Sequence, residues 1–179
     1  MNTNIEAPET GRRTLSFPYN PRSMELNLLA FETSSSCCGV ALLRQSGGPP
    51  EVAVLEWEGT QEHAERLLPM AGKLLARAGL APGDLHAIAF GQGPGGFTGL
   101  RVACGAAQGA ALGLGLPVVP VVSHLAVAEE SGAGPDDVVL VALDARMEEI
   151  YLAAYVRESG ASTVQDSIQD AADAQSWRE

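Results

Sequence analysis

Apolar residues form short continuous runs in the first third of the chain. The runs Leu26–Thr33, Cys37–Arg44 and Glu51–Glu58 are separated only by turns rich in serine, glycine and proline. This spacing predicts three antiparallel strands joined as a meander. Acidic residues flank the apolar positions of the third run, which predicts an edge strand with Val52 and Val54 pointing inward and Leu55 as a further inward candidate.

A change to spacings of three and four residues predicts a helix over residues 61–78, begun by Thr60 and ended by Gly79. The glycine-rich run 91–99 precedes a second predicted helix, whose N-cap is Thr98. The remaining pattern predicts a strand at 85–90, a helix at about 100–114, a strand at 117–122, a helix beginning near 124 and a hairpin at 138–156.

This order of elements predicts an α/β fold with a mixed sheet flanked by helices, as in RNase H-like and actin-like proteins. We expect an N-terminal lobe at 24–123 and a short, partial second lobe at 124–179, made of one hairpin and a polar tail. Residues 1–23 are polar with scattered prolines and predict a disordered leader, with translation from Met24 as the alternative.

Composition and charge narrow the classes of function. The 179 residues are 46% hydrophobic, which excludes wholesale disorder. With 22 acidic and 11 basic residues the net charge is −11, which argues against nucleic-acid binding by the chain alone, because such binding needs clustered cations. Three cysteines without a disulfide framework, and no apolar signal stretch, predict a cytoplasmic protein. The uncharged stretch 102–123 is rich in Ala and Gly and interrupted by prolines, so we expect no membrane span.

The run Gly91–Gly99 is the most informative motif, because five of its nine residues are glycine. It leads into a helix N-terminus, where free backbone N–H groups favour an anion and Arg101 adds a cation. It also matches G-x-G-x-x-G, but no acidic residue between 85 and 128 is available for a ribose, which argues against a dinucleotide. Close packing of the glycines on the sheet is an equally favoured alternative.

Two further patterns leave alternatives open. A stripe of glycines at four-residue spacing lies on the second predicted helix: Gly105, Gly109 and Gly113. It allows close approach of another backbone, from a partner or from the chain's own sheet. Glu32 and Asp144 end equivalent predicted strands and form a candidate pair of catalytic or metal-binding acids, although Arg146 could simply neutralise Asp144.

Four motifs that follow one another along the chain resemble the TsaB (YeaZ) family. They are Phe31–Ser34, Glu62–Pro69, Gly93–Arg101 and Asp144–Met147, and the resemblance spans residues 25–156. That family provides the partner subunit of the bacterial machinery that makes threonylcarbamoyladenosine in tRNA. Its members have the actin/sugar-kinase fold and act with the catalytic subunit TsaD and the ATPase TsaE. The complex transfers a threonylcarbamoyl group to the adenosine 3′ of the anticodon.

The resemblance implies a non-catalytic cytoplasmic scaffold that pairs with TsaD, meets TsaE through the complex and contacts tRNA only indirectly. A homodimer is the alternative for the isolated chain. No catalytic residue, metal or cofactor of its own is expected, while a nucleotide at the partner interface is left open. The implied interface lies on the first two predicted helices, at Leu67, Leu74, Arg101, Gly105 and Gly109. The signature loop, also the candidate anion contact, comprises Gly93, Pro94, Gly95, Gly96, Thr98, Gly99 and Arg101.

Three departures from related proteins limit what the resemblance implies. TsaD subunits bind metal through paired helix histidines, whereas the corresponding helix here has only His63. The turn Glu32–Ser36 lacks the glycine of the Asp-x-Gly-x-Thr nucleotide turn, and Gly96 stands where the family commonly has serine. A stand-alone actin-like ATPase or small-molecule kinase, using Glu32, Asp144 and the 91–99 loop, is the runner-up hypothesis.

The charge balance predicts the behaviour of the isolated chain toward RNA. With a net charge of −11 it should bind tRNA only weakly and without specificity, because it cannot displace the counterions of the phosphates. Filter binding or fluorescence anisotropy with purified tRNA at physiological salt measures this. Micromolar or tighter binding would contradict the scaffold hypothesis.

Overall fold

The computed structural model describes residues 25–59, 62–157 and 164–166, and within them the chain forms two sheets. The predicted leader 1–23 and the predicted helix cap Thr60 lie outside the described residues. The elements, in chain order, are β1 (Leu26–Glu32), β2 (Cys37–Gln45), β3 (Glu51–Glu58), α1 (His63–Ala78), the short 3₁₀ helix η1 (Pro82–Asp84), β4 (Ala87–Gly93), α2 (Phe97–Leu114), β5 (Val118–Val122), α3 (Ser123–Glu130), β6 (Val138–Arg146), β7 (Glu149–Arg157) and β8 (Val164–Asp166).

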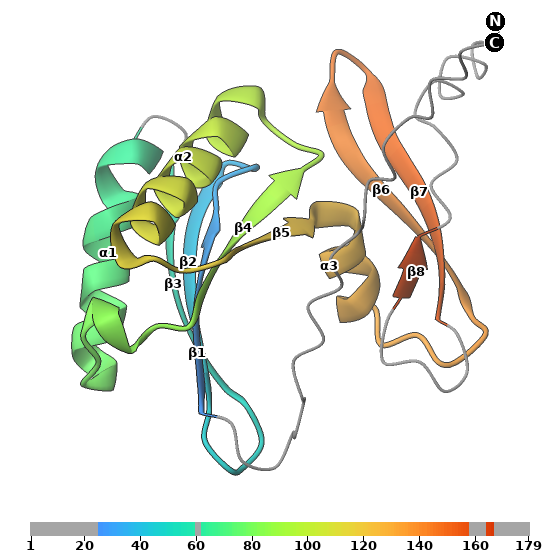
Figure 1. Cartoon of the computed structure of the whole chain (residues 1–179). Coiled ribbons are helices and arrows are strands. Elements are labelled where there is room, and N and C mark those ends of the chain that lie inside the picture. The colour runs from blue at the N-terminus through green and yellow to red at the C-terminus, as the bar shows by residue number, and fades with distance from the viewer. Residues whose placement is uncertain (1–24, 60–61, 158–163, 167–179) are drawn as a thin grey trace, which may run out of the picture.

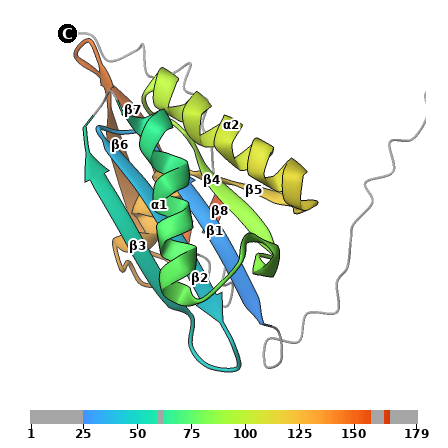
Figure 2. The same cartoon turned by 90° about the vertical axis from the view of Figure 1, so that its left-hand side faces the viewer.

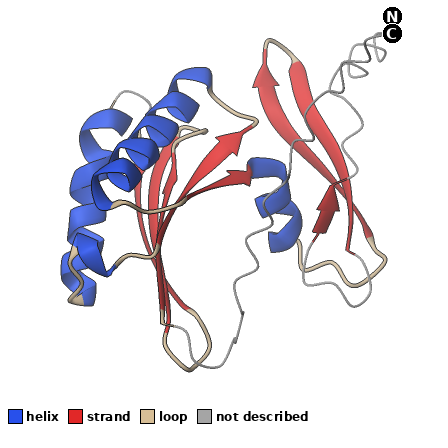
Figure 3. Ribbon diagram, viewed as in Figure 1, coloured by secondary structure: helices blue, strands red, loops and turns tan. Residues whose placement is uncertain are grey.

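The first sheet has the strand order β3-β2-β1-β4-β5. β1 pairs antiparallel with β2, which pairs antiparallel with β3, so the predicted meander is confirmed. β4 lies parallel to both β1 and β5, because each of these connections runs through a helix. The predicted mixed sheet flanked by helices is therefore confirmed (Figure 3).

Helices α1 and α2 lie side by side over one face of this sheet, and α3 lies on the opposite side (Figures 1 and 2). The main core fills the space between the sheet and the two helices. Large side chains of the strands meet leucines of α1 and a row of alanines on α2, and the fully buried members include Phe31, Val40, Leu42, Ile88, Leu67, Ala103 and Ala107. Alanine on the inner side of α2 keeps that helix close to the sheet.

β3 is an edge strand, as predicted, but its two valines do not point inward. Val52 and Val54 are 60% and 52% exposed, whereas Leu55, the further inward candidate, does contact the core. The register explains the error: Leu55 lies opposite the buried Val40, so the odd-numbered side chains of β3 face the helices. The prediction of inward-facing valines was therefore wrong.

The two long helices begin and end differently from one another. Gly79 ends α1 in the left-handed conformation, as predicted, with its N–H bonded to the carbonyl of Ala76. Helix α2 begins at Phe97 with Gly96 as its N-cap, one turn earlier than the sequence predicted. Thr98 therefore lies inside the helix and is not its cap.

The second sheet, β6-β7-β8, packs on α3 through a small core. The expected lobe boundary at 123/124 falls beside the start of α3 and stays a prediction. Among the residues whose side chains the structure describes, this core has three buried members: Ala128, Val141 and Tyr155. The other face of the hairpin exposes several large aliphatic side chains: Val138, Leu140, Ile150 and Leu152. No helix among the described residues is long and apolar enough to cross a membrane.

This difference in core size predicts unequal local stability. Backbone amides of β6 and β7 should exchange with solvent faster than those of β1 and β4, because less apolar area is lost when the small core opens. Hydrogen–deuterium exchange of the full chain, followed by mass spectrometry, measures the difference. Equal protection of the two sheets would show that they unfold as one cooperative unit.

Candidate functional site

The loop that contains Gly93–Gly96 sits directly on the turn after β1. The backbone N–H of Gly96 donates to the carbonyl of Ser34 over 2.6 Å. The hydroxyl of Thr33, which is fully buried, donates to the carbonyl of Gly99 over 2.6 Å. These two bonds fasten the start of α2 to the end of β1.

Two glycines of the loop are required by this close approach. A Cβ atom on Gly99 would lie within 3.0 Å of the Thr33 carbonyl oxygen, and one on Gly95 would clash with Ser34. A Cβ atom on Gly91 would meet only the carboxylate end of the Glu32 side chain, which can rotate away. The geometry therefore supports the packing alternative for Gly95 and Gly99. An anion contact by the loop stays a prediction, and the Gly96 N–H is already used by Ser34.

The two candidate acids each bond the backbone of their own turn. Glu32 accepts from the N–H of Ser34 over 2.5 Å, and Asp144 accepts from the N–H of Arg146 over 2.7 Å. Arg146 thus contacts Asp144 through its backbone N–H. Arg146, Met147 and Glu148 all have positive φ, between 56° and 66°, which forms a tight turn between β6 and β7.

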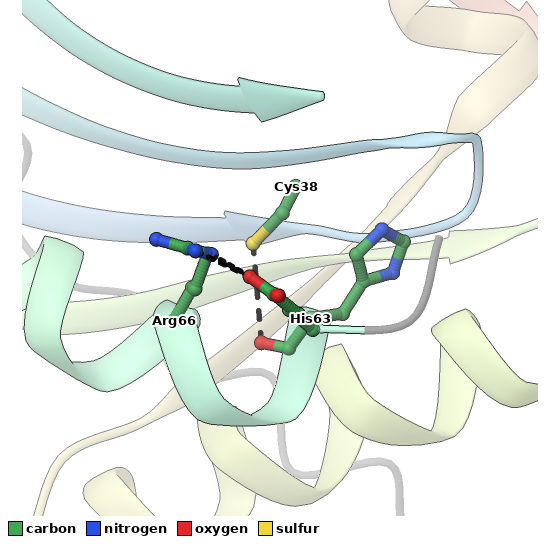
Figure 4. A network of polar contacts seen from close by, with 4 residues as sticks. Cys38, His63 and Arg66 are labelled. Atoms are coloured by element: carbon green, nitrogen blue, oxygen red, sulfur yellow. Dashed lines mark hydrogen bonds and ion pairs between the residues drawn. The ribbon is translucent and has the colours of Figure 1, made fainter. Parts of the chain in front are cut away.

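A polar cluster lies where the start of α1 meets the sheet, and Figure 4 shows Cys38 of β2 beside His63 and Arg66 of α1. The Cys38 thiol lies 4.0 Å from the carbonyl of the buried His63. Arg66 forms an ion pair with Glu62 and stacks 3.5 Å above the ring of Trp57. Burial raises the pKa of the Cys38 thiol and Cys37 raises it further, while Arg66 opposes them, so Cys38 stays protonated at neutral pH.

Within the ranges the structure describes, no three His, Cys, Asp or Glu side chains come together as a metal site. The expectation that His63 binds no metal stays a prediction.

The glycine stripe of α2 faces away from the sheet. Ala103, Ala107 and Ala111 form the buried row of the helix. A Cβ atom on any of the three stripe glycines would meet nothing within 4 Å: Gly105, Gly109 and Gly113. Packing of the stripe on the chain's own sheet, the alternative left open by the sequence, is therefore excluded by the geometry.

Other exposed groups continue this surface. Phe97 is 72% exposed, and the Arg101 guanidinium stacks 3.4 Å above its ring, one turn before Gly105. On α1, Leu68 is 55% exposed and Gly72 has open space around it. We call these outward residues the outer helix face: Leu68, Gly72, Phe97, Arg101, Gly105, Gly109 and Leu112.

Two residues predicted for the interface do not lie on this face. Leu67 and Leu74 are 0% and 3% exposed and belong to the core, so their assignment to the interface was wrong. The apolar stripe of an amphipathic helix faces the chain's own sheet. Leu68 was missed because it adjoins that stripe in sequence. Its position could have identified it: Leu68 directly follows Leu67, and two adjacent residues of a helix do not both lie at the centre of one buried stripe.

Comparison with known proteins gives consistent matches. A family model described as "TsaD: tRNA N6-adenosine threonylcarbamoyltransferase" matches residues 50–176. The tRNA threonylcarbamoyladenosine biosynthesis protein TsaB of Haemophilus influenzae is 39% identical over 155 residues, which cover 86% of this chain and 61% of that protein. TsaB of Escherichia coli K12 is 37% identical, with coverages of 74% and 56%. The chain thus spans about three fifths of the length of these relatives.

A solved structure matches the fold as well. YeaZ from Pseudomonas aeruginosa superposes with a TM-score of 0.65 at 39% identity, over 82% of this chain and 70% of that one. This likeness and the observed strand order confirm the predicted fold class, the actin-like/RNase H-like α/β fold.

The different surroundings of Gly99 and Gly105 predict that replacement by alanine changes the free energy of unfolding in opposite directions. Gly99→Ala should lower the free energy of unfolding by about 1–3 kcal/mol or more, because its Cβ would push Thr33 away. Gly105→Ala should raise it by up to about 1 kcal/mol, because alanine favours the helix and meets open space. Urea unfolding of the two variants measures both effects. Equal effects would contradict the packing of the loop described above.

Proposed function

The chain belongs to the TsaB (YeaZ) family, and from this premise we propose that it serves tRNA threonylcarbamoyladenosine biosynthesis as a non-catalytic partner subunit. The names of its relatives support the process. The turn Glu32–Ser36 lacks the glycine of the actin-like nucleotide turn, which supports a role other than catalysis and gives the ATPase or kinase hypothesis less support.

The outer helix face is the surface we assign to the partner, a TsaD-type subunit. The observation behind this assignment is the exposed glycine stripe of α2. Each glycine costs a helix about 1 kcal/mol relative to alanine, so three solvent-facing glycines are unfavourable for the isolated chain. Their bare backbone lets a partner helix approach closely, as small residues do at other close helix contacts.

The neighbouring residues supply contacts of two kinds at such an interface. Leu68, Phe97 and Leu112 expose apolar surface that a partner would remove from water. Arg101, held over the Phe97 ring, is positioned to pair with a partner carboxylate. In the absence of TsaD the same face suits a second copy of this chain, so a homodimer is the alternative assembly.

The remaining parts of the proposal concern the tRNA, the location of the chain and its cofactors. We propose that the partners bind the tRNA, because a chain of net charge −11 is poorly suited to bind RNA by itself. We also place the chain in the cytoplasm and expect TsaE to join through the complex. We assign it no cofactor of its own. A nucleotide at the interface with TsaD stays an open alternative.

Bulky substitutions in the glycine stripe test this assignment. Gly105→Leu and Gly109→Leu should leave the chain folded, since open space surrounds both sites, and should abolish co-purification with TsaD by steric exclusion. Gly83→Leu is the matched control, because that glycine of η1 also has open space around it but lies outside the outer helix face.

Thermal melts and affinity co-purification with TsaD from the same bacterium measure the two properties. Normal melting combined with parental TsaD binding in both stripe variants would remove α2 from the interface. Loss of self-association alone, measured by size-exclusion chromatography, would assign the outer helix face to the homodimer.

A further inference from the structure

The outer edge of β3 is unpaired. Within the part of the chain that the structure describes, this strand is hydrogen-bonded only to β2 and ends the five-stranded sheet. Its eight residues run alongside α1, which covers the inner side of the same edge (Figure 2). An exposed edge strand presents a row of backbone N–H and C=O groups to any extended chain that can reach it.

A groove of about 570 Å³ lies between this edge and α1. Leu55, Trp57, Pro69 and Met70 line it with apolar surface. Trp57 is 41% exposed although it lies on the helix-covered face, because the sheet ends beside it. The groove therefore offers apolar contacts directly next to unpaired strand backbone.

The charged residues around the groove are mainly acidic. Arg66 is already held by Glu62 and by the ring of Trp57. The other charged residues of the lining are Glu56, Glu65 and Lys73. The strand itself adds exposed carboxylates near each end, at Glu51 and Glu58.

From the open edge, the apolar lining and the excess of carboxylates, we propose that this β3 groove binds an extended segment of a partner protein in which apolar and basic residues alternate. The segment adds to β3 as a sixth strand. Its alternate side chains contact Trp57 and Met70 on one face and Val52 and Val54 on the other. Its lysines or arginines lie near Glu56 and Glu65.

A second copy of this chain does not fit the same place. Antiparallel pairing of two full-length β3 strands would set Glu51 of each copy opposite Glu58 of the other, which is unfavourable across a strand pair. The β3 groove also lies on a different side of α1 from the outer helix face. The proposal is therefore independent of the proposed pairing with TsaD.

The test uses two labelled synthetic peptides and the full chain. One is an eight-residue peptide of alternating valine and lysine, matched to the eight residues of β3. The other carries the same lysines, but proline replaces valine, so it has equal charge, lacks every second backbone N–H and has φ angles fixed away from the extended strand. Fluorescence anisotropy measures the dissociation constant of each peptide. We expect that of the valine peptide to be at least about tenfold lower than that of the proline peptide. The valine peptide should also slow amide exchange across 51–58.

Charge variants locate the binding. The double variant Glu56→Gln, Glu65→Gln should weaken binding of the valine peptide about threefold to tenfold, as expected for two exposed charge pairs. The matched control, Glu148→Gln with Glu149→Gln on the β6–β7 turn, should bind like the parent, and so should Gly83→Leu. Equal binding of both peptides, or unchanged exchange in β3, would overturn the proposal and indicate adhesion by charge alone.

Discussion

The contact between the backbone of Gly99 and the carbonyl of Thr33 determines how α2 is placed. It brings the first turn of the helix against the end of the central strand, where the Thr33 hydroxyl and the Gly96 N–H add hydrogen bonds. Once that end is fixed, the alanine row of α2 faces the sheet and the glycine row faces solvent, since the two rows lie on opposite sides of one helix. The glycine stripe of α2 is therefore exposed because the loop before the helix holds the alanine row against the sheet.

The sequence predicted the elements well because each apolar run has a clear period. The predictions were wrong where hydrophobic period alone cannot show which face of a strand is buried or at which residue a helix begins. Val52 and Leu55 are both apolar, and only the pairing of Leu55 with Val40 shows which of them faces the helices. The start of α2 was misplaced by one turn because backbone packing on Ser34, and no capping side chain, begins that helix.

The candidate site was less predictable than the fold. A glycine in a sequence shows that a side chain is absent, without showing what occupies the space, so Gly99 and Gly105 looked alike. One has a carbonyl oxygen where its Cβ would be, and the other has solvent. The cluster of Trp57, Glu62 and Arg66 was also not predictable, because it joins a strand to a helix through contacts that no local pattern encodes.

Helix α1 lies between the outer helix face and the β3 groove, and these two surfaces favour partners of different chemistry. On the side of α2 its outward residues are small or apolar, which favours close approach of another helix. On the side of β3 the charged residues of the helix and of the strand include more carboxylates than cations, which disfavours pairing of two copies of the exposed edge. Those carboxylates disfavour an acidic strand and favour a basic one. Protection of the edge against self-pairing therefore also defines the chemistry of a strand that could pair with it.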